Sequence, residues 1–143
     1  MARKPNWHQN EFTPKNPQKY VGTYPIIYRS SWENAFMQKC DTHPSIQKWA
    51  SESIKIPYYN PFYRRVTLYI PDFLIQYVDR TGKTIVEIIE IKPRNQAMES
   101  MAKGKTNKAM LKLNKLKWAA ATNWAKKHGM RFRVMTESDM FYT

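Results

Sequence analysis

Residues 69–92 read YIPDFLIQYVDRTGKTIVEIIEIK, and this stretch predicts two β-strands joined by a tight turn. Residues 68–78 are rich in Ile, Leu, Val, Phe and Tyr, and residues 84–91 are almost entirely Ile and Val, a composition typical of strands. The turn at residues 80–83 contains Gly82, which adopts a positive φ angle at little cost. We therefore expect an antiparallel hairpin with largely buried strands.

Three charged residues, Asp72, Glu90 and Lys92, lie within this apolar hairpin. Glu90 and Lys92 are two positions apart, so they project from the same face of one strand, and Asp72 can meet them from the partner strand. Two carboxylates held close together favour a divalent cation such as Mg²⁺, which prefers hard oxygen ligands. A neighbouring lysine can orient water or stabilise charge on a phosphate. The alternative is a surface hairpin with solvated ion pairs, which the apolar neighbours disfavour.

The composition predicts one folded domain that binds a polyanion. The chain has 143 residues, 42% of them hydrophobic, and 24 basic against 11 acidic residues give a net charge of +13. Nucleic acid is the obvious polyanionic partner, and an RNA-binding protein without a catalytic site is an alternative. The single Cys40 excludes an intramolecular disulfide and cannot form a zinc site by itself. No run approaches the length of a membrane span, so we expect a cytoplasmic protein without a membrane partner.

The N-terminal part of the chain begins with a polar segment and continues into a helix. Residues 1–27 carry several prolines and lysines and are expected to form a basic extended arm, either disordered or bound to DNA or protein, before a domain over residues 28–143. Ser30 or Ser31 can cap a helix that runs to about Cys40. Glu33 falls in its first turn, where a capping acid is the simplest interpretation. Short strands are expected within residues 45–56, followed by an aromatic turn at residues 57–61.

A long basic helix is predicted from Gln96 to about His128. Residues 103–133 contain ten Lys and Arg residues and no acidic one, which indicates phosphate contact, because solvated faces normally mix both signs. Residues 131–136 alternate and predict a last strand, parallel to a neighbour. The helix should pack on the sheet through an apolar stripe at helical spacing: Ala109, Leu113, Leu116, Ala120 and Trp124.

The Pro-Asp step, the hairpin and the Glu-x-Lys triplet together resemble the PD-(D/E)xK nuclease superfamily. The element order matches its α/β fold, a restriction-endonuclease-like αβββαβ core with a mixed central sheet flanked by helices. Residues 28–33 (YRSSWE) and 90–93 (EIKP) resemble most the head completion nuclease family of T-even-like tailed phages, which shares its fold with TnsA-type transposon nucleases. This resemblance implies a Mg²⁺-dependent DNA endonuclease that acts in the host cytoplasm, at the portal end of the filled head.

The resemblance also implies roles for individual residues. Asp72 and Glu90 would hold Mg²⁺, for which Mn²⁺ can substitute, Glu33 would supply a further carboxylate, and Lys92 would act on the attacking water. Gln96 is a weaker candidate. Double-stranded DNA would be bound through its phosphates, with little base specificity. The basic residues expected to bind it are Arg64, Arg65, Lys105, Lys108, Lys112 and Lys115.

A second interpretation assigns no catalysis to the chain. It would then be a structural head completion or neck protein, located in the virion, that binds DNA and the portal. Leu111 and Trp118 are apolar and lie off the predicted core stripe of the long helix, so they are the candidate contacts for such a partner.

Overall fold

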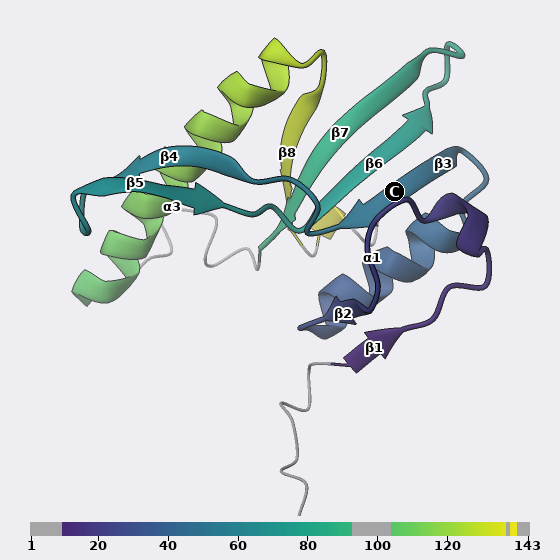
Figure 1. Cartoon of the computed structure of the whole chain (residues 1–143), viewed down its shortest axis with the longest axis horizontal. Helices are drawn as coiled ribbons and strands as arrows, with labels where there is room; N and C mark the ends of the chain where they lie inside the picture. Colours follow the sequence, from purple (N-terminus) through teal and green to yellow (C-terminus); the bar gives the residue numbers. More distant parts are fainter. Residues whose placement is uncertain (1–9, 93–103, 137, 140–143) are drawn as a thin grey trace, which may run out of the picture.

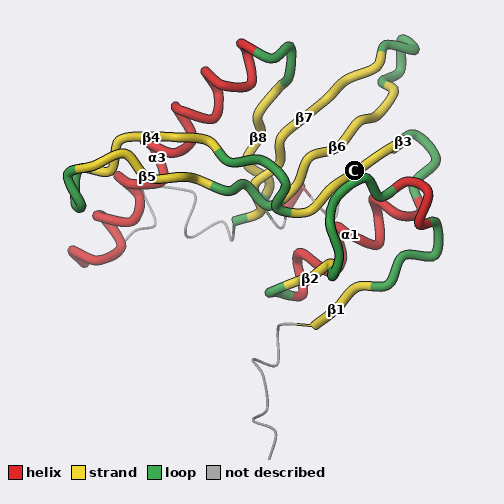
Figure 2. The backbone as a smooth tube through the Cα atoms, viewed as in Figure 1, coloured by secondary structure: helices red, strands yellow, loops and turns green. Residues whose placement is uncertain are grey.

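A four-stranded mixed sheet forms the centre of the fold, in the order β3-β6-β7-β8. A computed structural model describes residues 10–92, 104–136 and 138–139, and Figures 1 and 2 show the arrangement. Neighbouring strands are antiparallel except for the parallel pair β7 and β8. The strands of this sheet are Ile46–Ser51 (β3), Phe73–Val78 (β6), Thr84–Ile91 (β7) and Arg131–Met135 (β8).

The predicted hairpin is confirmed as the pair β6 and β7. Phe73 pairs with Ile89 at one end and Val78 with Thr84 at the other. The turn contains Gly82 at a φ of 85°, and the Asp79 side chain accepts hydrogen bonds from the backbone of residues 81 and 83. Local turn chemistry therefore sets the register of the two strands.

The residues on either side of this hairpin differ from the prediction. Arg65–Tyr69 (β5) pairs with Ile56–Asn60 (β4) as a separate two-stranded ribbon, so residues 57–60 lie in a strand rather than in the expected turn, and only Pro61 of that segment is in a turn. Pro71 lies between β5 and β6 and has no amide hydrogen to continue a ladder, which explains why the apolar run of residues 68–78 splits there. The ribbon packs on α3, as Figure 1 shows.

The helices cover opposite faces of the sheet. Ser31–Thr42 (α1) buries Phe36, Met37 and Cys40 against odd-numbered strand residues such as Phe73 and Ile89. Gly104–Lys127 (α3) packs on the other face, where Ala121 and Ala125 meet Ile88 and the ribbon. Ser30 caps α1 by accepting a hydrogen bond from the Glu33 amide at 3.1 Å, which confirms the predicted helix start.

The predicted core stripe of α3 is partly wrong. Leu116 is 38% exposed, whereas Leu111 is 5% exposed. Trp118 is partly buried against the α3-side core. Ala121 and Ala125 are buried instead, because small side chains allow a helix to approach a sheet closely. Neither Leu111 nor Trp118 therefore offers the exposed apolar surface expected of a partner contact.

The described part of the expected N-terminal arm packs on the domain. Asn10–Phe12 (β1) pairs with Ile26–Tyr28 (β2), a short 3₁₀ helix (η1) spans Pro17–Lys19, and Tyr20 is buried with Phe12 and Ile26 in the α1-side core. Aromatic side chains thus make residues 10–27 part of the fold rather than an extended arm. Residues 1–9 lie outside the described residues, and the division of the chain at residue 27 stays a prediction.

The buried Asp41 at the end of α1 attaches the N-terminal segment to the domain. Its carboxylate accepts hydrogen bonds from the amides of Lys15 and Asn16 at 2.8 and 2.9 Å. The Asp41 carbonyl accepts two more, from the Asn16 and Lys19 side chains. These bonds hold residues 15–19 in place although little of this segment is apolar.

The predicted order of elements is confirmed for the described residues, with the ribbon β4-β5 inserted between β3 and β6. α1, β3, β6, β7, α3 and β8 form an α/β fold of the restriction-endonuclease-like type. The last strand lies parallel to β7, as expected. The start of the long helix near Gln96 falls outside the described residues. No described helix is long and apolar enough to span a membrane.

Candidate active site

The hairpin brings Asp72, Glu90 and Lys92 together at the end of β7. Asp72 directly precedes β6, and its Oδ2 accepts the amide hydrogen of Ile91 at 2.8 Å. Lys92 Nζ lies 3.8 Å from Glu90 Oε2. Lys92 donates its own amide to the Met135 carbonyl, so β8 fixes the strand end that carries the lysine. The sequence therefore correctly predicted the convergence, while the catalytic roles stay predictions.

Glu90 is a buried carboxylate that accepts a hydrogen bond at one oxygen and lies at ion-pair distance from Lys92 at the other. Only 7% of the residue is exposed, and Oε1 accepts a hydrogen bond of 2.7 Å from the Tyr69 hydroxyl. Burial raises the pKa of Glu90, although Tyr69 and Lys92 both favour its charged form. Burial and the charge of Glu90 also raise the pKa of Tyr69, so the phenol keeps its proton and donates.

The electrostatics of Asp72 depend on burial and on the neighbouring acids. Burial raises its pKa to about 8, with further contributions from the charges of Glu90 and Glu33, against the Ile91 hydrogen bond and Lys92. Without a metal, the folded protein therefore favours a protonated Asp72 at neutral pH. A divalent cation at this site would compete with that proton.

Glu33 has a capping role of its own. Its Oε1 accepts the backbone amide hydrogen of Arg29 at 3.0 Å, one residue before the N-cap, so one carboxylate oxygen holds the start of α1. Burial raises the pKa of Glu33, and the charges of Glu52 and Glu90 act in the same direction. The capping interpretation therefore fits the geometry, while a metal-binding role for Glu33 remains a prediction.

The donor set suits a hard cation that keeps much of its own water. Among the described residues, no three Asp, Glu, His or Cys side chains are arranged to hold a metal ion by themselves. Mg²⁺ needs fewer protein ligands than that, because it commonly uses one or two carboxylates together with waters and substrate phosphate. Asp72 and Glu90 are buried and raise each other's cost of ionisation, and a bound dication would relieve that cost.

The comparisons with known proteins agree with this geometry. Residues 43–137, about two thirds of the chain, match the family model for the TnsA-like endonuclease N-terminal domain. The chain belongs to this family. It is also 31% identical over 144 aligned positions to the head completion nuclease of Enterobacteria phage T4, with 93% of each chain covered. Asp72, Glu90 and Lys92 lie inside the matched TnsA-like region, whereas Glu33 precedes it.

Two side-chain contacts at or beside the site of this TnsA-like domain could not be predicted from the sequence. Tyr69 reaches Glu90 from the ribbon, outside the central sheet. Arg29 makes two hydrogen bonds of 3.2 Å to Glu52, and the Glu52 amide donates to the Asp72 carbonyl at 2.9 Å. Glu52 has a φ of 50°, the left-handed region that non-glycine residues seldom adopt. Only the folding of the strand ends brings these residues together.

The residues expected to bind DNA are placed in two groups. Arg64 and Arg65 are exposed at the tip of the ribbon, and Arg65 lies 5.8 Å from the ring centre of Tyr63. Lys108, Lys112 and Lys115 are exposed on α3. Gln96 lies outside the described residues, and the side chain of Lys105 outside the described side chains.

Lys117 is a basic residue of α3 that the sequence analysis did not select. Its ammonium group lies 5.7 Å from the ring centre of Tyr69, and its charge acts on Glu90. Lys117 is thus placed beside one of the candidate metal ligands.

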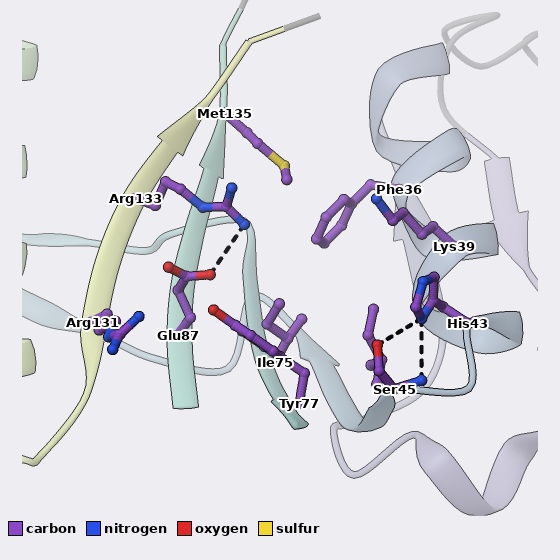
Figure 3. Close-up of a pocket in the computed structure, with 11 residues that line it drawn as sticks. Phe36, Lys39, His43, Ser45, Ile75, Tyr77, Glu87, Arg131, Arg133 and Met135 are labelled. Carbon is purple, nitrogen blue, oxygen red and sulfur yellow. Dashed lines mark hydrogen bonds and ion pairs between the residues drawn. The ribbon is translucent and has the colours of Figure 1, made fainter. Parts of the chain in front are cut away.

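A separate cavity of about 430 Å³ lies on the α1 face of the sheet. Figure 3 shows Lys39 of α1 and His43, which follows this helix, on one side, and Arg131 and Arg133 of β8 on the other. The buried Glu87 pairs with Arg133 across 3.1 Å. Arg133 thus offsets the buried charge of Glu87, whose carboxylate also interacts with the Tyr77 hydroxyl.

We expect Arg133→Leu to lower the free energy of unfolding by about 1–3 kcal/mol, because it leaves the Glu87 charge buried without its cationic partner. The double variant Glu87→Met/Arg133→Leu should recover most of this loss, since it removes both charges. Urea unfolding measures both effects. Arg131→Leu, on the same strand and exposed, is the matched control and should change little. A double variant as unstable as the single one would contradict this role for the pair.

Proposed function

We propose that this TnsA-like domain is a metal-dependent DNA endonuclease that acts in phage head completion, with Mg²⁺ as its working cation. The observation that carries the proposal is the convergence of Asp72, Glu90 and Lys92 at the buried end of β7. The name of the T4 relative supports the biological setting. On this proposal the protein acts in the host cytoplasm during assembly, or in the virion, at the portal end of the head.

Each residue would contribute through its position. Asp72 and Glu90 would hold Mg²⁺ together with the backbone carbonyl of Ile91, and Glu33 would assist from the start of α1. When bound, the ion supplies Lewis-acid stabilisation and lowers the pKa of a coordinated water. Lys92 would donate hydrogen bonds to the attacking water or to the phosphate oxygens, which keeps both in line.

The duplex would be held by its phosphates rather than by its bases. α3 presents exposed lysines, and the ribbon tip presents Arg64 and Arg65. Such contacts position DNA without reading its sequence. We therefore propose double-stranded DNA, bound largely without sequence preference, as the substrate, and the portal or neck as the protein surface near which the enzyme acts.

This arrangement predicts a steep salt dependence of DNA binding. Replacing three α3 lysines with Ala should lower affinity by about 100-fold at low salt and reduce the slope of log K against log[salt] by about 3. Fluorescence anisotropy with a labelled duplex at several salt concentrations measures both. The variant carries Lys108→Ala, Lys112→Ala and Lys115→Ala, and its control carries Lys15→Ala, Lys48→Ala and Lys83→Ala. Equal slopes for variant and control would show that α3 does not contact the duplex.

The function is tested by incubating supercoiled and linear duplex DNA with the protein and Mg²⁺, Mn²⁺ or EDTA. We expect cleavage with either metal and none with EDTA, while DNA binding persists in EDTA. A folded protein that binds DNA and never cuts it, with or without added portal protein, would replace the proposal with a structural role in the neck.

A further inference from the structure

The hydroxyl of Tyr69 is placed to control one of the two candidate metal ligands. Tyr69 ends β5, in the ribbon that packs on α3, and so comes from outside the central sheet. It is 5% exposed and donates to Glu90 Oε1 across 2.7 Å, a short bond of the kind formed with a charged acceptor. The contact joins residues 21 positions apart.

The Tyr69 ring is fixed on several sides. Phe132 of β8 meets it edge-on, with ring centres 6.5 Å apart at 77°. Lys117 of α3 places its ammonium group 5.7 Å from the ring centre. The ring also belongs to the buried cluster that includes Ile56 and Ile88. A ring held in this way cannot turn its hydroxyl away from Glu90 without disturbing strand, ribbon and helix together.

This bond determines which oxygen of Glu90 is left for a cation. Tyr69 occupies Oε1, whereas Oε2 lies at ion-pair distance, 3.8 Å, from Lys92. Asp72 is similar, since its Oδ2 is taken by the Ile91 amide. Each carboxylate therefore has one oxygen held by a neutral donor, Tyr69 for Glu90 and the Ile91 amide for Asp72. The Asp72 amide and Lys92 also stabilise the charged form of Glu90, and a cation would bind on the Oε2 side, next to Lys92. Donors in such positions are known to orient metal ligands and to tune their affinity.

We propose that Tyr69 is a positioning residue that orients Glu90 for metal binding. The inference rests on the proposed function, because it takes Asp72 and Glu90 as metal ligands. Without the hydroxyl, the Glu90 carboxylate can rotate and must be reordered each time a metal binds. The ribbon and α3 thereby become part of the metal site, although neither supplies a ligand. A purely structural role would instead stabilise the fold without changing metal affinity.

The test is the affinity of the protein for Mn²⁺ without DNA, measured by isothermal titration on the wild type and on Tyr69→Phe. We expect the dissociation constant to rise by about 10- to 100-fold in Tyr69→Phe, the range typical of lost outer-sphere partners. Tyr58→Phe is the matched control. The Tyr58 hydroxyl lies in the same ribbon but is bonded to the Asn60 side chain at 3.3 Å, so its loss should leave the constant within about twofold.

Replacing Tyr69 with 4-aminophenylalanine provides a rescue that a packing role would not explain. This ring keeps a hydrogen-bond donor at the same position, and we expect it to restore the wild-type constant. It also keeps the inference testable if Tyr69→Phe fails to fold. The inference would be overturned if Tyr69→Phe had the Mn²⁺ dissociation constant of the wild type. It would also be overturned if the 4-aminophenylalanine variant bound Mn²⁺ more weakly than the wild type. A wild type that binds no Mn²⁺ would instead contradict the proposed function, as would Asp72→Asn with unchanged Mn²⁺ binding.

Discussion

Asp72→Asn should abolish metal-dependent cleavage and at the same time stabilise the metal-free protein above neutral pH. The amide oxygen can still accept the Ile91 hydrogen bond, so the loop before β6 should keep its shape. One of two carboxylate ligands is lost, and we expect the rate of DNA cleavage to fall by about 1,000-fold or more. A gel assay with supercoiled DNA and Mg²⁺ measures this loss.

The stability effect follows from the raised pKa of Asp72. An acid whose pKa is higher in the folded state, here about 8 against 3.8, stabilises the fold fully below its unfolded pKa. This contribution is lost as pH rises through about 8, because folding then requires a buried charge. Asn does not titrate. The stability advantage of Asp72→Asn should therefore grow between pH 4 and pH 8 and level off above pH 8, with an upper limit of roughly 6 kcal/mol set by the shift from 3.8 to about 8.

Urea unfolding in EDTA, at pH 5 and pH 8.5, measures this difference. Asp79→Asn is the matched control, because hydrogen bonds from Thr81 and Lys83 lower the pKa of Asp79 in the exposed turn. That variant should lose stability above pH 4 and should cleave normally. If Asp72→Asn were less stable than the wild type at pH 8.5, the buried Asp72 charge would not be destabilising in the metal-free protein. The electrostatic reason for a cation site would then be lost.

Lys92→Met should reduce cleavage by about 100- to 10,000-fold while the protein still binds Mn²⁺. The side chain is 24% exposed and lies 3.8 Å from Glu90 Oε2, so it is open to solvent beside the proposed metal ligand. Met preserves the length of the side chain but donates no hydrogen bond. The expected signature is therefore a loss of turnover with Mn²⁺ and DNA binding largely retained, measured by single-turnover cleavage and isothermal titration.

Lys83→Met is the matched control for Lys92→Met, because it removes the same charge from the exposed turn at the other end of β7. It should cut DNA at the wild-type rate. Lys92→Met with normal turnover would exclude the lysine from the chemistry and leave it a structural partner of Glu90.

Local patterns predicted the elements that local interactions stabilise. The turn that contains Gly82 predicted the hairpin, and Ser30 predicted the start of α1. Both predictions were possible because turn and cap interactions involve residues only a few positions apart. The same hairpin register brought Asp72 to Glu90 and Lys92. The sequence also missed elements whose pairing is not local: β4 was expected as a turn, and the packed segment before α1 as an extended arm.

By itself, the sequence determined the order of the strands and helices of the αβββαβ core, the concentration of positive charge and the meeting of the Asp, Glu and Lys side chains. Only the tertiary structure decided which face of α3 is buried, that Tyr69 holds Glu90 and that Glu87 pairs with Arg133, 46 residues away. The physical reason is the separation along the sequence of the residues that interact. A turn, a cap or a strand register is encoded within a few residues, whereas these contacts depend on how the ribbon, α3 and β8 pack on the sheet. In α3, apolar residues recur at helical spacing along two neighbouring rows, so periodicity alone does not decide which row is buried.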